Sequence, residues 1–161
     1  MKFEKFLKSV GTHGEVINRN ESEKWLLCGG VGMVIPRGVT NLLGGSRSSE
    51  YASIVDVISN VSCDDALARL ALKRAVLFEA DGKAGDIYRV FANDLDEEIG
   101  IMNADYGLIE RRDVLSYLEI EVDTDENGNP LPPEDCKTVK YMLVFNAKGD
   151  IQGFITGSAR F

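Results

Sequence analysis

The chain has 161 residues, of which 44% are hydrophobic and 27% are charged, a composition typical of a soluble globular protein that is long enough to bury one core. Eighteen lysines and arginines stand against 26 acidic residues, giving a net charge of −8. This charge disfavours a general nucleic-acid binder, because contacts with phosphate need a cationic surface. The composition also excludes extensive disorder, collagen and a disulfide miniprotein. We therefore expect a single domain over residues 1–161.

The first ten residues predict an amphipathic helix or arm. Four apolar residues follow at i, i+3, i+4 and i+7: Phe3, Phe6, Leu7 and Val10. This spacing places them along one face of a helix, and Gly11 is a natural end. A helix of this length is marginal alone in water, so the apolar stripe must dock on something. We predict that the stripe is an interaction site, on its own subunit or on a neighbouring copy.

The next segments predict a hairpin and then a helix. Residues 15–19 and 24–28 resemble two strands, and the polar residues 20–23 join them. Glycines and a proline interrupt residues 31–43, which we interpret as short buried strands or tight loops where backbones approach closely. Apolar residues return at helical spacing over residues 51–58, which predicts a second helix.

A third helix and a second hairpin are expected further along the chain. A pattern resembling a capping box begins at Ser62, and the strong helix formers of residues 66–72 follow it. Beyond them, residues 75–78 and 87–92 read as two strands, which we expect to pair as a hairpin across residues 81–86.

The last third of the chain gives the clearest strand signal. Apolar and polar residues alternate over residues 114–122, and strand patterns recur at residues 138–145 and 151–156, with a turn at residues 147–150. Together, the elements predict an α+β, strand-dominated fold. We expect an antiparallel sheet or small barrel, with two or three short helices in the first half.

One segment matches the calcium loop of an EF-hand. Its donors have the required spacing: Asp123, Asp125, Asn127 and Glu134. However, a strand pattern and not a helix precedes them, and three prolines occupy the second half of the loop. We therefore predict no metal site and favour a solvated loop that turns at Asn127 and Gly128, with calcium binding as the alternative.

The other reactive residues form no recognisable catalytic set. His13 is the only histidine, and its spacing to Cys28, Cys63 and Cys136 does not indicate a Cys–His pair. The glycine-rich residues 29–32 lack the further residues of a phosphate-binding loop. Three scattered cysteines are a poor disulfide framework and favour reduced thiols. We predict no catalytic residue, no cofactor and no enzymatic activity.

Negative charge is concentrated in the second half of the chain. Residues 1–80 carry ten bases and nine acids, whereas residues 81–161 carry eight bases and seventeen acids. Fourteen of these acids lie in residues 94–135, beside only two bases. This run is either a solvated acidic face or a contact surface for a basic partner. The longest uncharged stretch, residues 25–36, is too short to span a bilayer, so we expect no membrane partner.

Two segments carry a resemblance to a known group of proteins. KWLLCGGVGMVIP at residues 24–36, with FNAKGDI at residues 145–151, resembles small structural and assembly proteins of tailed bacteriophages and prophages. The resemblance implies a non-enzymatic virion component or assembly factor that acts as a homo-oligomer. It would contact copies of itself or other virion proteins, in the cytoplasm of a bacterial host or in the virion. A small-molecule or calcium-binding module, or an enzyme with no recognisable motif, remains the alternative.

Overall fold

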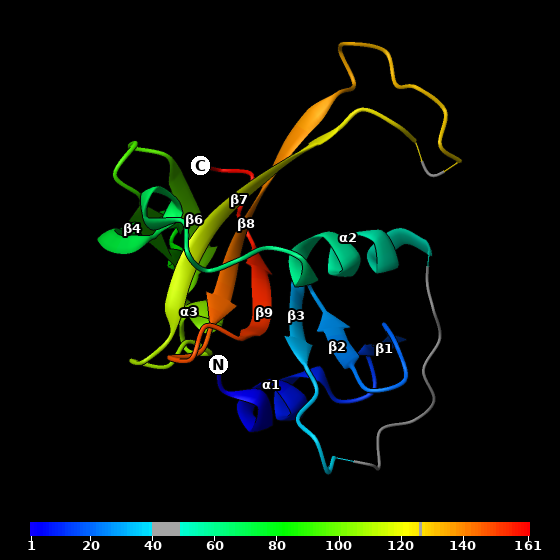
Figure 1. The fold of residues 1–161 in the computed structure, drawn as a ribbon. Coiled ribbons are helices and arrows are strands. Elements are labelled where there is room, and N and C mark those ends of the chain that lie inside the picture. Colours follow the sequence, from blue (N-terminus) through cyan, green and yellow to red (C-terminus); the bar gives the residue numbers. More distant parts are fainter. Residues whose placement is uncertain (40–48, 126) are drawn as a thin grey trace.

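The computed structural model describes residues 1–39, 49–125 and 127–161. Within these ranges nine strands form two antiparallel sheets, accompanied by three α-helices (Figure 1). The predicted strand-dominated α+β class is confirmed. Both sheets have free outer strands and neither closes, so the alternative of a small barrel is wrong. None of the described helices is long and apolar enough to cross a membrane.

The larger sheet has six strands. Their order is β1 (Glu15–Asn18), β2 (Lys24–Cys28), β3 (Val31–Val34), β9 (Ile151–Thr156), β8 (Lys137–Phe145) and β7 (Val114–Val122). The predicted hairpin β1–β2 and the strands β7, β8 and β9 are confirmed. Gly29 and Gly30 join β2 to β3 with φ of +59° and +81°, the positive values that a two-residue hairpin turn requires. The contact of β3 with β9 unites the two ends of the chain in one sheet.

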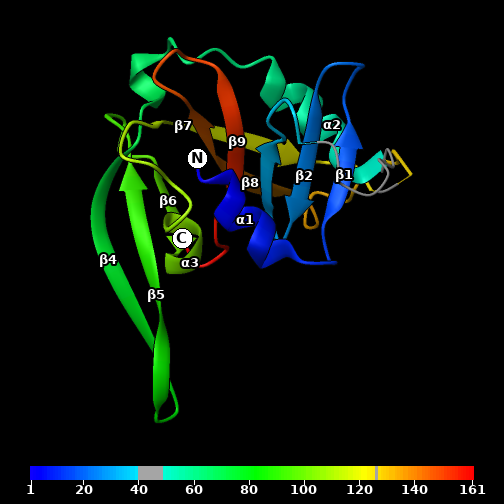
Figure 2. The same cartoon turned by 90° about the horizontal axis from the view of Figure 1, so that it is seen from below.

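The smaller sheet has three strands in the order β4 (Ala71–Ala80), β5 (Lys83–Ala92) and β6 (Glu98–Met102). The predicted pairing of β4 with β5 is confirmed, but the strands continue to a tight turn at Asp81 and Gly82. The hairpin projects from the body of the molecule (Figure 2). Strand β6 had no counterpart among the predicted elements.

Two of the predicted helices form, and the third does not. α1 (Phe3–Val10) and α2 (Ser49–Ser59) are confirmed. The helix expected over residues 66–72 is wrong, because only one 3-10 turn (Ala66–Ala68) forms before the chain enters β4. Its cap is Asp65 and not Ser62, since the Asp65 carboxylate accepts a hydrogen bond from the Leu67 amide at 3.1 Å.

The remaining differences concern α3 and the region after β3. The short helix α3 (Asn103–Tyr106) lies in the second half of the chain, where no helix was expected. In the segment predicted over residues 31–43, β3 is a buried strand. The part of that segment beyond residue 39 lies outside the described residues.

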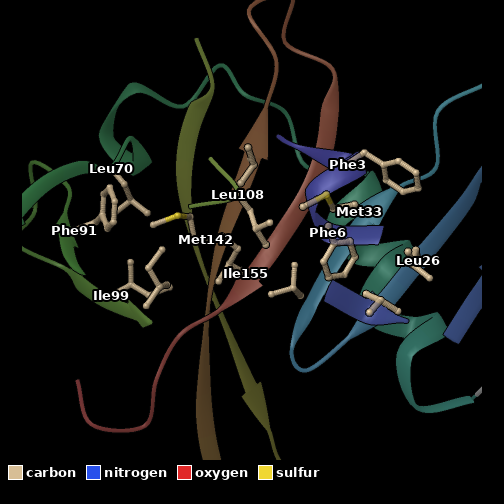
Figure 3. Packing of buried hydrophobic residues seen from close by; sticks show 14 of the residues in the cluster. Phe3, Phe6, Leu26, Met33, Leu70, Phe91, Ile99, Leu108, Met142 and Ile155 are labelled. Atoms are coloured by element: carbon tan, nitrogen blue, oxygen red, sulfur yellow. The ribbon is translucent and has the colours of Figure 1, made fainter. Parts of the chain in front are cut away.

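Buried side chains form two clusters, one on each face of the six-stranded sheet. On one face, α1 and the three-stranded sheet pack against residues such as Leu26, Met33 and Met142. Figure 3 shows Phe91 and Ile99 of the smaller sheet beside Met142 of the larger one. On the other face, α2 covers the cluster that contains Trp25. The first cluster therefore joins α1 and both sheets.

Candidate functional site

Two hollows flank the turn between β2 and β3. One is a cavity of about 160 Å³ next to the α2 face of the sheet. The other is an open groove of about 640 Å³ between α1 and α3. Cys28, Gly29 and Val31 line both hollows, so the turn forms their shared wall.

The smaller cavity brings together residues that are distant in the sequence. Its apolar wall includes Leu27 and Phe154, and its polar residues include His13, Glu15 and Thr156. Glu15 lies here because it pairs with Leu27 across β1 and β2, and paired residues share one face of a sheet. The Thr156 hydroxyl is engaged, since it donates to the main-chain oxygen of Gly30 at 2.7 Å.

Cys28 contributes its side chain to the groove side. Successive residues of a strand point to opposite faces, so Cys28 points away from the face of Leu27. Its side chain packs with the cluster on the α1 face, next to its strand partner Val31. The half-buried thiol therefore lies on the α1 face, whereas Glu15 shares the face of Leu27.

The groove has an apolar floor and a charged rim. The floor is made by Phe6, Val10, Val31 and Leu108, all of them buried in the first cluster. α1 also contributes Lys5 and Ser9, while β5 contributes Arg89 and α3 contributes Asn103, Asp105 and Tyr106. α1 and α3 both contribute to the first cluster, through Phe6 and Tyr106 respectively, and the groove lies between them.

Neutral groups hold the two cations of the groove. Lys5 donates from Nζ to the main-chain oxygen of Gly107 at 3.3 Å. Arg89 donates from Nε to Oδ1 of Asn103 at 3.1 Å, and its guanidinium carbon lies 5.0 Å from the centre of the Tyr106 ring. None of the ion pairs between described residues includes Lys5 or Arg89. Their charges are therefore directed to the groove without a carboxylate partner.

Asp105 is the acidic residue of the same groove. Burial raises the pKa of its carboxyl group, because the charged form loses hydration. Together with Lys5 and Arg89, the groove therefore holds two cations and one carboxyl group.

The four residues of the calcium-loop pattern lie far from both hollows, in the hairpin loop between β7 and β8 (Figure 1). In this loop Oδ1 of Asp125 accepts hydrogen bonds from the amides of Asn127 and Asn129, both at 2.9 Å. The carboxylate thus organises the turn at Gly128, where φ is +80°. The loop lies between two strands, and a search of the described residues finds no group of three metal-binding side chains.

The apolar stripe of α1 packs inside its own subunit. Phe3, Phe6 and Val10 are buried in the first cluster and Leu7 is partly buried against it. The amide of Lys2 also donates to the main-chain oxygen of Leu108 at 2.8 Å. Within this subunit the stripe is therefore buried, and its contact with a neighbouring copy stays a prediction.

Sequence reasoning missed the charged residues of the groove. Lys5, Arg89 and Asp105 belong to three separate segments and share no local motif. Only the unpaired cationic face of the N-terminal helix gave a signal, in Lys2, Lys5 and Lys8. Comparisons of this chain with protein-family models, with curated proteins and with solved structures find no match. The function therefore has to be argued from the geometry of the molecule itself.

Proposed function

We propose that this chain is a non-enzymatic structural or assembly protein that associates with copies of itself through the β4–β5 hairpin. The observation that carries the proposal is a pair of exposed apolar side chains, Leu77 and Ile87, on a hairpin that projects from the body (Figure 2). Leu77 is 54% exposed and Ile87 is 41% exposed. They are direct partners across β4 and β5, so they form one continuous apolar patch.

The patch continues the face of the hairpin that builds the core. Ile87 and Phe91 are four positions apart on β5, so their side chains lie on the same face of the strand. Phe91 is buried in the first cluster. Nearer the tip, the same face extends beyond the larger sheet and Ile87 becomes exposed. The patch therefore continues a buried face of the hairpin but is itself exposed to solvent in this subunit.

The opposite face of the hairpin is covered by the C-terminal residues. Phe161 packs on Phe78 and Tyr88, with ring centres 5.8 and 5.7 Å apart. The guanidinium of Arg160 lies 4.7 Å from the centre of the Phe78 ring. One face of the hairpin is thus closed within the subunit, which singles out the Leu77 face for an external contact.

The edge of β4 favours a second copy of this chain as the partner that covers the patch. β4 is an outer strand with pairing on one side only among the described residues, and such an edge is a template for another strand. If two copies of β4 paired antiparallel about Val76, the exposed Leu77 of each copy would stand opposite Ala75 of the other. Side chains directly opposite each other in such a pair are close enough to pack. The regular stretch between the two register shifts of β4, residues 74–78, would form the centre.

The setting that we propose is the particle of a tailed phage or prophage, or its assembly. The resemblance of residues 24–36 and 145–151 to proteins of that group supports this setting. A self-associating hairpin suits it, because a virion component must repeat its own contacts.

The test is the molar mass in solution, measured by light scattering over a range of concentrations. We expect the wild-type mass to rise with concentration. Replacing the patch by Leu77→Thr with Ile87→Thr should weaken association about tenfold or more, because apolar area no longer becomes buried. Threonine suits a strand, so the hairpin itself should persist.

Leu67→Thr and Leu95→Thr are the matched controls, since both leucines are more than half exposed and lie outside the hairpin. They should leave the association unchanged. A wild-type chain that stays monomeric at all concentrations would refute self-association. A double variant that keeps the wild-type mass would show that the hairpin is not the interface.

A further inference from the structure

We propose that the groove between α1 and α3 binds a small organic carboxylate with an apolar body. This inference is tested separately from self-association, because ligand binding and molar mass are different measurements, although Arg89 of the groove and Ile87 of the patch both belong to β5. It rests on three observations: a preformed groove, an apolar floor, and two cations held by neutral groups.

The groove has the size and the floor of a small-molecule site. Its volume of about 640 Å³ falls within the range of roughly 300–1000 Å³ that is common for such sites. Phe6 and Leu108 in its floor are 3% and 6% exposed, so the core fixes their positions. The apolar body of a ligand would therefore enter a surface that already exists and would gain from leaving water.

Arg89 provides the directional contact. Its Nε donates to Asn103, and its guanidinium lies over the Tyr106 ring. Its two terminal nitrogens donate no hydrogen bond to any of the described residues. A planar guanidinium with free terminal nitrogens matches the two oxygens of a carboxylate. The two neutral contacts orient the side chain, so it loses little further freedom when a ligand binds.

Lys5 adds a second positive charge at the other end of α3. It is held by the carbonyl of Gly107, which uses one of its three N–H groups. A contrast within the molecule makes this arrangement informative. Lys73 and Arg74 both pair with Glu98 at 2.8–2.9 Å. In the described part of the chain, Lys5 and Arg89 line the groove without an ion pair of this kind.

The apolar floor determines which anion fits. Inorganic phosphate could meet the two cations but has no apolar part to cover the floor. A nucleic acid is disfavoured by the net charge of −8. The chemistry that suits the groove is therefore one carboxylate joined to an apolar chain or ring.

Octanoate is a suitable probe, and calorimetric titration is the first measurement. We expect saturable binding of one octanoate per chain, and weaker binding of both octanol and inorganic phosphate. Arg89→Gln should weaken octanoate binding about tenfold, since it removes the charged hydrogen bonds. Lys5→Gln should weaken it by a smaller factor, and Lys148→Gln, in the turn between β8 and β9, should have no effect.

Cys28 provides a second measurement that does not depend on Arg89. Its half-buried side chain is on the groove side of the sheet, so a bound ligand should shield it. In a chain that carries Cys63→Ser and Cys136→Ser, we expect octanoate to slow the reaction of Cys28 with a thiol reagent. This readout remains valid if Arg89→Gln disturbs α3.

Three outcomes would overturn the proposal. Equal affinity for octanol and octanoate would show that the carboxylate is not recognised. Binding that is unchanged in both Arg89→Gln and Lys5→Gln, with no protection of Cys28, would place the ligand elsewhere. Absence of octanoate binding to the wild-type chain at millimolar concentration would refute the site, and light scattering would still report on self-association independently.

Discussion

Glu98 is the residue with the densest set of charged contacts in the described part of the chain. Its carboxylate accepts two hydrogen bonds from Arg74, at 2.8 and 3.1 Å, and one from Lys73 at 2.9 Å. Its main-chain oxygen accepts a further bond from Lys140 of β8. The hydrogen bonds from Arg74 are the main cause, and the hydrogen bond from Lys73 the second, of a Glu98 pKa lowered to about 2. Glu98 thus ties the start of β4 to β6 and contacts the larger sheet.

This arrangement predicts a pH-dependent contribution to stability. A carboxyl group whose pKa falls on folding stabilises the fold above its unfolded value, about 4.5 here, and the contribution is lost as the pH falls to about 2. We expect the melting temperature of Glu98→Gln to lie below that of wild type at pH 7. The difference should close between pH 4.5 and pH 2, and salt should reduce it because the groups are exposed.

Thermal unfolding at a series of pH values checks this expectation, with Glu121→Gln as the control. Glu121 is exposed on β7 and its replacement should give no comparable closing of the difference. A difference in melting temperature between wild type and Glu98→Gln that stays constant down to pH 2 would contradict this role of Glu98.

Glycine 32 shows how one position can fix the contact between strands. A Cβ atom there would overlap the ring of Phe154, and a Cβ at Gly153 would overlap the main-chain oxygen of Gly32. The Phe154 ring in turn lies 6.1 Å from Trp25 and 5.7 Å from Tyr141, measured between ring centres. The close approach expected from the glycine-rich segment is therefore real, and it occurs between β3 and β9.

At the scale of elements, α1 is a helix that owes its order to tertiary contacts. It has eight residues, and a free helix of that length is marginal in water. Its buried side chains and the hydrogen bond from Lys2 to Leu108 hold it on the sheet. α1 also forms one wall of the groove, so its position matters for the proposed ligand site.

Truncation of the stripe should therefore reduce stability. We expect Phe6→Ala to lower the free energy of unfolding by about 3–5 kcal/mol, the usual cost of removing a buried aromatic side chain. Leu7→Ala, the matched control on the same helix, should cost less because Leu7 is only partly buried. Urea unfolding measures both values.

The same variants separate the two roles of the stripe. If Phe6→Ala left the stability unchanged but lowered the molar mass in solution, the stripe would contact a neighbouring copy and the intrasubunit packing would not be its role. A loss of stability without a change in the association constant would support the packing seen here.

For the whole molecule, both sheets contribute side chains to the first cluster. Leu70, Phe91 and Ile99 from the region of the smaller sheet share it with Met142 and Ile155 of the larger sheet. Chains of this size that share one core usually unfold in one step. The single domain predicted over residues 1–161 therefore remains our expectation.

Two optical signals test this cooperativity. Trp25 is fully buried in the second cluster, so its fluorescence reports on the larger sheet, whereas far-ultraviolet circular dichroism reports on all strands. We expect both signals to change at the same urea concentration. A separate early transition in circular dichroism would mean that the three-stranded sheet unfolds independently.

Four acids of residues 94–135 have separate roles in the structure. Glu98 pairs with Arg74 and Lys73, Asp105 lines the groove, and Asp113 pairs with the amino group of Met1 at 2.7 Å. Asp125 organises the β7–β8 loop. These four acids therefore make four different sets of contacts.

The sequence by itself determined the elements whose signals are local. Helix α1 follows from a four-residue apolar stripe, and β9 from a strand pattern bounded by a turn. The β4–β5 hairpin follows from Asp81 and Gly82 between two strand-like runs. Each of these signals depends on residues within a few positions of one another, so periodicity and turn chemistry were sufficient.

Tertiary structure alone decided the rest. Residues 66–72 favour a helix locally, but Ala71 and Leu72 pair with Ala92 and Phe91 of β5 instead. The hydrogen bonds of this strand pairing outweigh a small difference in helix propensity. Strand β6 and helix α3 have five and four residues, too few for a periodic signal. The groove depends on two contacts: Lys5 meets Gly107 across 102 residues, and Arg89 meets Asn103 across 14 residues. Both arise only when burial of the shared core brings α1, β5 and α3 together.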